Sequence, residues 1–208
     1  MNAMNMRHTF LKSSRFILLS LLLGVCSACS LGGARHTQTH YVLSDPQPVT
    51  AASKPLWPGT LLVSDVEAPA FYQNPALAFS RENGTRGYYQ YARFTDLPGT
   101  ALTALVVRRL ARSGLFEAVS TPGQGVSGQW QLNLRLIDFY HAASSPPGSV
   151  LLSFDAELVG RASARLLSHK HFEVTAAADS FDAPGAAAAA NRAVGSGLDQ
   201  LTLWLGSR

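Results

Sequence analysis

Two stretches in the second half of the chain alternate apolar and polar residues with a period of two. In 129–139 the apolar positions are Trp130, Leu132, Leu134 and Leu136, and 150–158 repeats the pattern. Successive side chains of a strand point to opposite faces of a sheet, so this period predicts strands with one face buried and one in water. A second layer must therefore cover the apolar face.

Two amphipathic helices are predicted to form that layer. The first runs from about Pro98 to Ser113, with Arg109 spaced among its apolar positions, and Gly114 is placed to end it. The second begins at Asp182-Ala183-Pro184, an N-cap followed by a proline in the first turn. We predict an α+β fold, a largely antiparallel sheet with the two helices packed on one face.

Shorter elements precede and follow these. Strands are expected at 41–43, 61–66, 76–80, 87–94 and 170–181, and Asn83-Gly84 is a strong hairpin signal. The four prolines of 44–59 predict an extended connection, and 141–149 is expected to be a loop between strands.

The N-terminus has the pattern of a secretory signal peptide. Arg7, Lys12 and Arg15 precede an apolar run, 16–25, which small residues follow. The run has about 10 residues, whereas a membrane-spanning helix needs roughly 20. We therefore expect residues 1–28 to be removed.

The end of this segment, Cys26-Ser27-Ala28-Cys29, resembles the lipobox of bacterial lipoproteins, in which a cysteine is acylated and becomes the first residue. Cys29 follows two small residues. Cys26 has a leucine three places upstream but a β-branched valine next to the cut. We predict lipidation at Cys29, with Cys26 or an ordinary signal peptide as alternatives. Residues 29–40 then form a lipidated flexible tether and 41–208 a single domain.

The net charge bears on possible partners, and the residue after Cys29 bears on location. Three of the 17 basic residues and none of the 13 acidic residues precede Cys29, which leaves a formal charge near +1 and predicts no nucleic-acid partner. Ser30 stands where many lipoproteins retained in the inner membrane have aspartate. This resemblance implies the inner leaflet of the outer membrane, facing the periplasm, where two or three acyl chains anchor stably.

Catalytic motifs do not stand out in the sequence. No nucleophile elbow or clustered set of metal ligands occurs, so we expect no enzyme activity, no cofactor and no metal. We interpret His169 and His171, and likewise Asp155 and Glu157, as solvated pairs on strand faces.

An aromatic cluster is the strongest candidate for contacts. It serves either as core or as a surface for a partner or lipid, and both interpretations stay open. The candidates are Phe71, Tyr72, Tyr88, Tyr89, Tyr91, Arg93 and Phe94.

The order of features resembles a known family. A lipobox is followed by Tyr41-Val42-Leu43, by Tyr91-Ala92-Arg93-Phe94 before a proline-opened helix, by a Trp-x-Leu-x-Leu-x-Leu strand and by a final Leu-Trp-Leu. This is similar to the ABC-type transport auxiliary lipoproteins, which include the paraquat-inducible protein C type, over about residues 40–206. Phe94 stands where the family usually has tryptophan.

The resemblance implies a non-catalytic, periplasm-facing component of a system that moves lipids between the inner and outer membranes. Its partner would be a protein with mammalian cell entry (MCE) domains, beside an ATPase and a permease. A structural lipoprotein that helps to assemble or seat an outer-membrane protein is the alternative. The sequence leaves open whether the chain forms a homo-oligomer.

Overall fold

The computed structural model describes residues 37–207. The predicted signal peptide 1–28, Cys29 and most of the predicted tether 29–40 lie outside these residues. The described strands are β1 (Thr39–Tyr41), β2 (Trp57–Val63), β3 (Ala76–Ser80), β4 (Gly87–Phe94), β5 (Phe116–Ser120), β6 (Trp130–Ala142), β7 (Ser149–Gly160) and β8 (Arg165–Ala177). The described helices are the 3-10 turn η2 (Ala70–Tyr72), α2 (Pro98–Ser113) and α3 (Ala183–Gly206).

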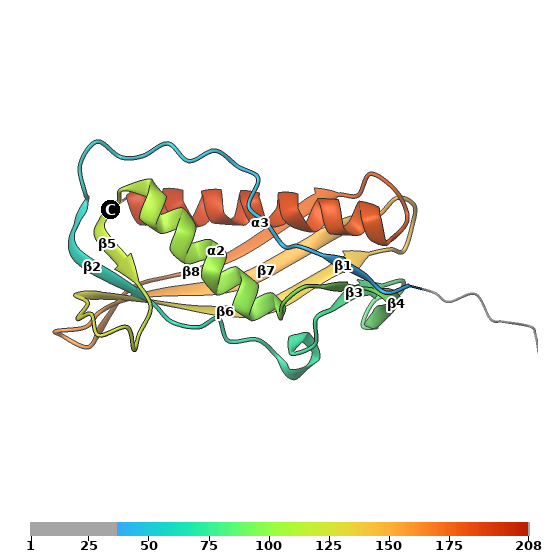
Figure 1. The fold of residues 1–208 in the computed structure, drawn as a ribbon, viewed down its shortest axis with the longest axis horizontal. Helices are drawn as coiled ribbons and strands as arrows, with labels where there is room; N and C mark the ends of the chain where they lie inside the picture. Colours follow the sequence, from blue (N-terminus) through green and yellow to red (C-terminus); the bar gives the residue numbers. More distant parts are fainter. Residues whose placement is uncertain (1–36, 208) are drawn as a thin grey trace, which may run out of the picture. The chain divides into compact units, whose positions relative to one another are not determined.

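One sheet contains all eight strands, with β6 at its centre (Figure 1). On one side β6 pairs along its whole length with β7, and β7 pairs with β8, both antiparallel. On the other side β2 lies beside the start of β6 and β3 beside its end, both parallel. β5 extends the sheet beyond β2, and β4 followed by β1 extends it beyond β3. The long pairings are therefore antiparallel, and the parallel ones are short.

The two helices pack on one face of this sheet. α3 lies over β7 and β8, and α2 contacts β2, β5 and α3 (Figure 1). Leu132 and Leu136 of β6 point into this layer and are fully buried. Burying a leucine stabilises the fold by about 2 kcal/mol. The α+β prediction, with both helices on one face, is confirmed.

The helix ends have the signals that the sequence predicts. Pro98 opens α2, and Gly114 follows it with a left-handed backbone, φ 65°. Asp182 caps α3 by accepting a hydrogen bond from the Gly185 amide at 2.9 Å. The Ser180 hydroxyl and the Gly185 amide lower the pKa of the Asp182 carboxyl.

Several boundaries differ from the prediction. β2 is Trp57–Val63 rather than 61–66, because it pairs with β5 from Trp57 onward. β8 ends at Ala177 rather than 181. β1 is Thr39–Tyr41 rather than 41–43, because the chain leaves the sheet after Tyr41 and buries Leu43 in the core. β8 begins at Arg165 rather than 170 because it pairs with the whole of β7. His141, expected in a loop, lies in β6, which continues to Ala142.

Residues 42–56, here called the crossing segment, run over the helices from β1 to β2 (Figure 1). The Ser44 amide donates to the side-chain oxygen of Asn191 in α3 at 2.9 Å. The Ala52 amide donates to the carbonyl of Ser113 at the end of α2 at 2.8 Å. The segment thereby joins the two ends of the domain across both helices.

Candidate functional site

Three of the aromatic candidates form one stack where η2 meets β4. The Phe71 and Tyr88 rings are stacked with centroids 4.4 Å apart, and the Tyr72 ring meets Phe71 edge-on at 5.2 Å. The Tyr88 hydroxyl donates to the Phe71 carbonyl at 2.6 Å. The fold thus brings together residues that are 17 positions apart in the chain.

The Asp138 carboxylate on β6 bonds to this stack through the Tyr72 hydroxyl. Asp138 Oδ1 accepts from the Tyr72 hydroxyl at 2.9 Å and from Arg86 Nη2 at 2.9 Å. The Arg86 guanidinium also lies 3.6 Å from the centroid of the Tyr140 ring, a cation–π contact. Burial raises the pKa of Tyr72, which keeps its hydroxyl protonated as a donor.

Tyr89 belongs to a second aromatic group, around His141. The His141 side chain is buried, and its Nε2 donates to the Pro147 carbonyl at 2.9 Å. Its Nδ1 lies 2.7 Å from the Tyr89 hydroxyl, and Phe181 meets the imidazole ring edge-on at 6.0 Å. Burial, and then the charge of Asp182, raise the pKa of Tyr89.

The remaining candidates separate into interior and surface residues. Phe94 is 3% exposed and stacks on Phe139, with ring centroids 5.6 Å apart. Tyr91 is 39% exposed. The Arg93 Nε and Nη2 atoms lie 2.9 and 3.0 Å from the side-chain amide group of Gln38. A register shift in the β3–β4 pair breaks the alternation along β4, so strand periodicity alone does not place these side chains.

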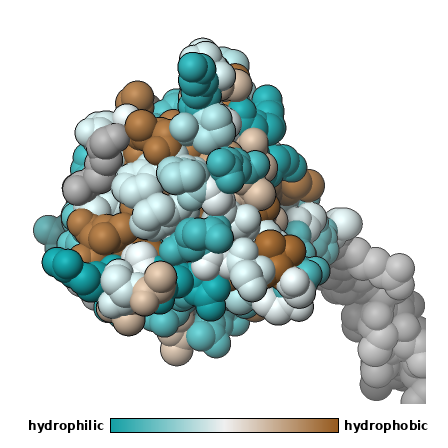
Figure 2. Space-filling model, turned by 90° about the vertical axis from the view of Figure 1, so that its left-hand side faces the viewer, coloured by the Kyte–Doolittle hydropathy of each residue, from teal (hydrophilic) through white to brown (hydrophobic). Residues whose placement is uncertain are grey.

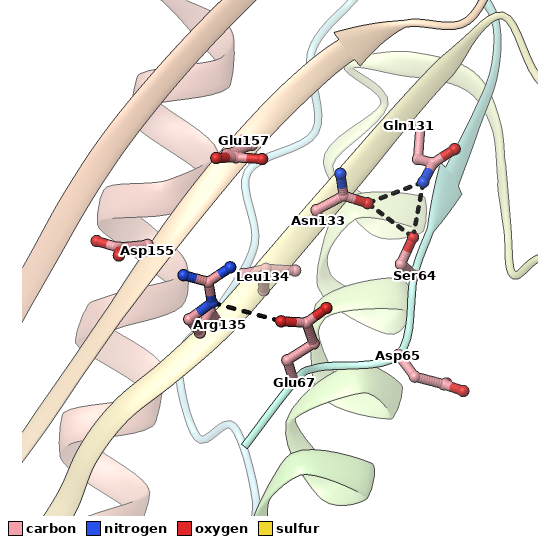
Figure 3. A pocket seen from close by; sticks show the side chains of 9 residues that line it. All are labelled: Ser64, Asp65, Glu67, Gln131, Asn133, Leu134, Arg135, Asp155 and Glu157. Atoms are coloured by element: carbon pink, nitrogen blue, oxygen red, sulfur yellow. Dashed lines mark hydrogen bonds and ion pairs between the residues drawn. The ribbon is translucent and has the colours of Figure 1, made fainter. Parts of the chain in front are cut away.

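The uncovered face of the sheet holds a polar groove of about 320 Å³ (Figure 3). Gln131 Nε2 donates to Asn133 Oδ1 at 2.9 Å and to Ser64 Oγ at 3.1 Å, while Arg135 lies 3.4 Å from Glu67. The lining residues are Ser64, Asp65, Glu67, Gln131, Asn133, Leu134, Arg135, Asp155 and Glu157. Hydrogen bonds within the groove satisfy most of its neutral side chains.

The histidine pair faces the same side of the sheet. His171 Nδ1 lies 2.8 Å from Asp155 Oδ1, and His169 Nε2 lies 3.9 Å from it. Both histidine side chains are about half exposed. Among residues 37–207 no three His, Cys, Asp or Glu side chains are placed to hold a metal ion. In the same range, no helix is long and apolar enough to cross a bilayer.

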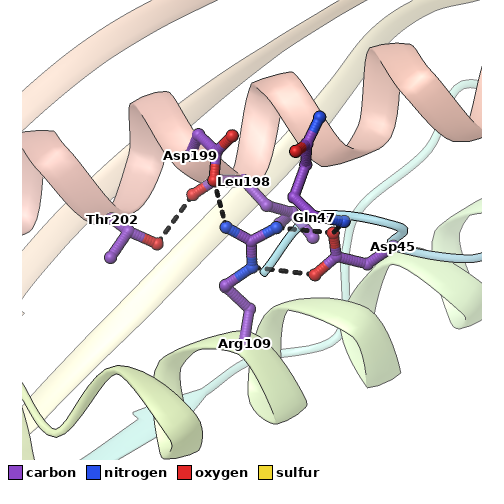
Figure 4. A network of polar contacts seen from close by, with 6 residues as sticks. All are labelled: Asp45, Gln47, Arg109, Leu198, Asp199 and Thr202. Atoms are coloured by element: carbon purple, nitrogen blue, oxygen red, sulfur yellow. Dashed lines mark hydrogen bonds and ion pairs between the residues drawn. The ribbon is translucent and has the colours of Figure 1, made fainter. Parts of the chain in front are cut away.

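Sequence reasoning missed a buried ion cluster between the helices (Figure 4). Arg109 of α2 donates from Nε to Asp45 at 2.8 Å and from Nη2 to the other Asp45 oxygen at 2.5 Å, and it also pairs with Asp199 of α3. Burial alone would lower the pKa of Arg109, but the two carboxylates outweigh it and the net shift is upward. An arginine at an apolar position of α2 was the available signal.

Comparison of the sequence with models of known protein families identifies the family of this chain. The model of the ABC-type transport auxiliary lipoprotein component matches residues 41–202. The chain belongs to this family. No curated protein matches the chain.

Two solved structures share the fold of this ABC-type transport auxiliary lipoprotein. Protein XCC0632 from Xanthomonas campestris has a TM-score of 0.72 at 21% identity, covering 80% of this chain and 93% of its own. A second, described as an uncharacterized protein, has a TM-score of 0.63 at 13% identity, covering 81% and 99%. At these identities the likeness shows the fold alone.

The segments that resemble the family lie at packing positions in this auxiliary lipoprotein. Tyr41 pairs with Phe94 across β1 and β4, and Trp204 of α3 meets Phe172 edge-on at 5.9 Å. Trp130 begins β6 and lies edge-on to Trp57 at 5.0 Å. These residues hold the scaffold, and membership of the family implies association with an ABC transporter.

Proposed function

We propose that the chain is a non-catalytic, periplasm-facing component of an ABC transport system that moves lipids between the inner and outer membranes. Its direct partner is the MCE-domain protein of that system. The observation that supports this most is the family match over residues 41–202. On the polar face, Ser153 Oγ lies 3.4 Å from His171 Nε2, and His171 Nδ1 lies 2.8 Å from Asp155, but Ser153 is only 3% exposed. Among the described residues no three His, Cys, Asp or Glu side chains are placed to hold a metal ion.

Acylation of Cys29 holds the domain at the inner leaflet of the outer membrane in this proposal. Gln38, the first residue of the compact unit, is nine positions beyond Cys29. Nine extended residues span about 30 Å, so the end of the domain around β1 stays close to the bilayer. The aromatic candidates lie at this end, on and around β4 (Figure 1).

We further propose that the accessible members of the aromatic cluster contact lipid. Tyr91 is the most exposed of them, and Phe71, Tyr88 and Arg93 are partly buried. Tyrosine and arginine suit the headgroup region because each combines an apolar body with a polar end. Tyr72, Tyr89 and Phe94 then hold these side chains in place.

The anchor is tested with Cys29→Ser in the full chain, with Cys26→Ser as the matched control. The Cys29 variant is expected to be a soluble periplasmic protein that no longer supports the envelope barrier, whereas the Cys26 variant stays in the membrane. Fractionation and mass spectrometry of the N-terminal peptide measure both. A Cys29 variant that remains acylated and active would contradict the proposal.

A further inference from the structure

The end of the domain opposite β1 combines apolar and basic side chains on two connections. Two segments together are called the distal tip: the β5–β6 loop, residues 121–129, and residues 161–167, which form the β7–β8 turn and the start of β8. Both connections lie at the far end of the sheet from β1 (Figure 1). The Arg161 amide donates to the Gln129 carbonyl at 3.0 Å, and Arg161 Nη1 to the Gly128 carbonyl at 3.2 Å. The two connections therefore form one surface.

Large apolar side chains are exposed on this surface. Leu166 is 56% exposed, Val126 46% and Leu167 38%. Figure 2 looks onto this end of the molecule and shows apolar residues around its margin, with paler residues between them. A partner that covers these side chains removes apolar surface from water, which favours binding.

A hollow of about 510 Å³ lies at the tip. Its lining is Pro58, Gly59, Gln129, Trp130, Gly160, Ala162 and Ser163. The Trp130 indole donates to the Pro58 carbonyl at 2.9 Å, so one wall is fixed by a hydrogen bond between β6 and β2. An open, mostly apolar hollow suits a protruding apolar side chain of a partner.

Basic side chains outnumber acidic ones at the tip. Arg161 and Arg165 are exposed, and neither 121–129 nor 161–168 contains an acidic residue. Glu117 of β5 lies beside the hollow, where its Oε2 accepts a hydrogen bond from the Gly59 amide at 2.8 Å. A complementary surface is therefore acidic as well as apolar.

The proposed lipid anchor at Cys29 limits what can bind to the distal tip, and this step rests on the proposed function. The strands β6 and β8 have 13 residues each and span about 40 Å, more than the roughly 30 Å of the extended tether. The domain thus cannot stand upright in the inverted orientation, with its tip against the leaflet that holds Cys29 and β1 farthest from it. A second copy in that leaflet would point its tip in the same direction, so two tips cannot meet face to face.

We propose that the distal tip is the docking surface for the MCE-domain protein, which presents an acidic surface with a protruding apolar side chain from the periplasmic side. The apolar contact is supplied by Leu166, by Val126 and by the hollow at the tip, which Trp130 helps to line. Arg161 and Arg165 fix the orientation and speed the encounter.

Binding of the purified MCE-domain protein to the full chain by biolayer interferometry tests this. Leu166→Glu and Val126→Glu are expected to weaken binding about ten-fold or more, because each places a charge in an apolar contact. The double variant Arg161→Glu/Arg165→Glu weakens it most at low salt. Val42→Glu, an exposed apolar position near β1, is the control and leaves binding unchanged. All variants are checked by circular dichroism and thermal unfolding.

The outcomes separate this inference from the proposed function. If the wild type binds the MCE-domain protein and the tip variants bind equally well, the docking surface is elsewhere and only the inference fails. If the wild type does not bind it, both fail. Tip-dependent flotation with anionic phospholipid vesicles, or tip-dependent self-association by analytical ultracentrifugation, would assign the surface to a membrane or to a second copy and overturn the inference.

Discussion

At the scale of single residues, the Arg109 cluster is unequal in its two carboxylates. The Asp45 side chain is 5% exposed and binds the guanidinium with both oxygens, whereas Asp199 is 42% exposed. Removing one partner of a buried pair leaves an uncompensated charge, but an exposed partner adds little. The cluster therefore depends mainly on Asp45.

Asp45→Ala is expected to lower the free energy of unfolding by about 3 kcal/mol, and Asp199→Ala by less than about 1 kcal/mol. Urea unfolding of the soluble domain measures both. Equal losses would show that Arg109 is not held chiefly by the crossing segment.

The aromatic cluster makes a second prediction at this scale. Phe94→Ala empties a buried site and is expected to cost about 3 to 4 kcal/mol of stability. Tyr91→Ala is expected to cost less stability than Phe94→Ala and to reduce binding to phospholipid vesicles. Thermal unfolding and vesicle co-sedimentation separate the two roles. If Tyr91→Ala lowered stability but left binding to vesicles unchanged, Tyr91 would have a packing role and not a lipid-contact role.

At the scale of elements, the Asp182 cap gives α3 a dependence on pH. The lowered pKa means that the ionised carboxyl stabilises the folded state above its ordinary value of 3.8, and that this contribution is lost as the pH falls through the folded value. An asparagine at this position would cap the helix without a charge.

Asp182→Asn is therefore expected to be less stable than the wild type at pH 6, with the difference shrinking as the pH is lowered past about 4. Asp182→Ala lacks the cap at either pH and stays the less stable of the two variants. Thermal unfolding at a series of pH values measures this. A constant difference between wild type and Asp182→Asn would contradict the assignment.

Elements whose ends carry turn or cap residues were predictable, and pairings set by distant contacts were not. The strand 87–94 and the helix 98–113 have the predicted bounds, because turn and cap residues mark their ends. The parallel pairings of β2 and β3 with β6 depend on contacts between distant segments and leave no local signal. The same holds for the aromatic candidates: the sequence names Phe71 and Tyr88 as candidates, but their stacking and the hydrogen bond from Tyr72 to Asp138 required the fold.

At the scale of the whole molecule, the domain has two ends that differ in chemistry. Aromatic side chains around β4 lie near β1, where the tether enters, and the basic, apolar distal tip lies at the other end (Figure 1). The crossing segment, fixed to α3 by Asn191 and to α2 by Arg109, connects β1 to β2. The proposed function assigns the first end to lipid, and we separately propose that the second end binds a protein partner.

Native mass spectrometry of the acylated protein, mildly extracted from its own membranes, tests the proposed function most directly. The account predicts a complex with an MCE-domain protein, and the measured mass also gives the number of copies. A lone monomer, or a complex with an outer-membrane protein and no transporter component, would contradict it.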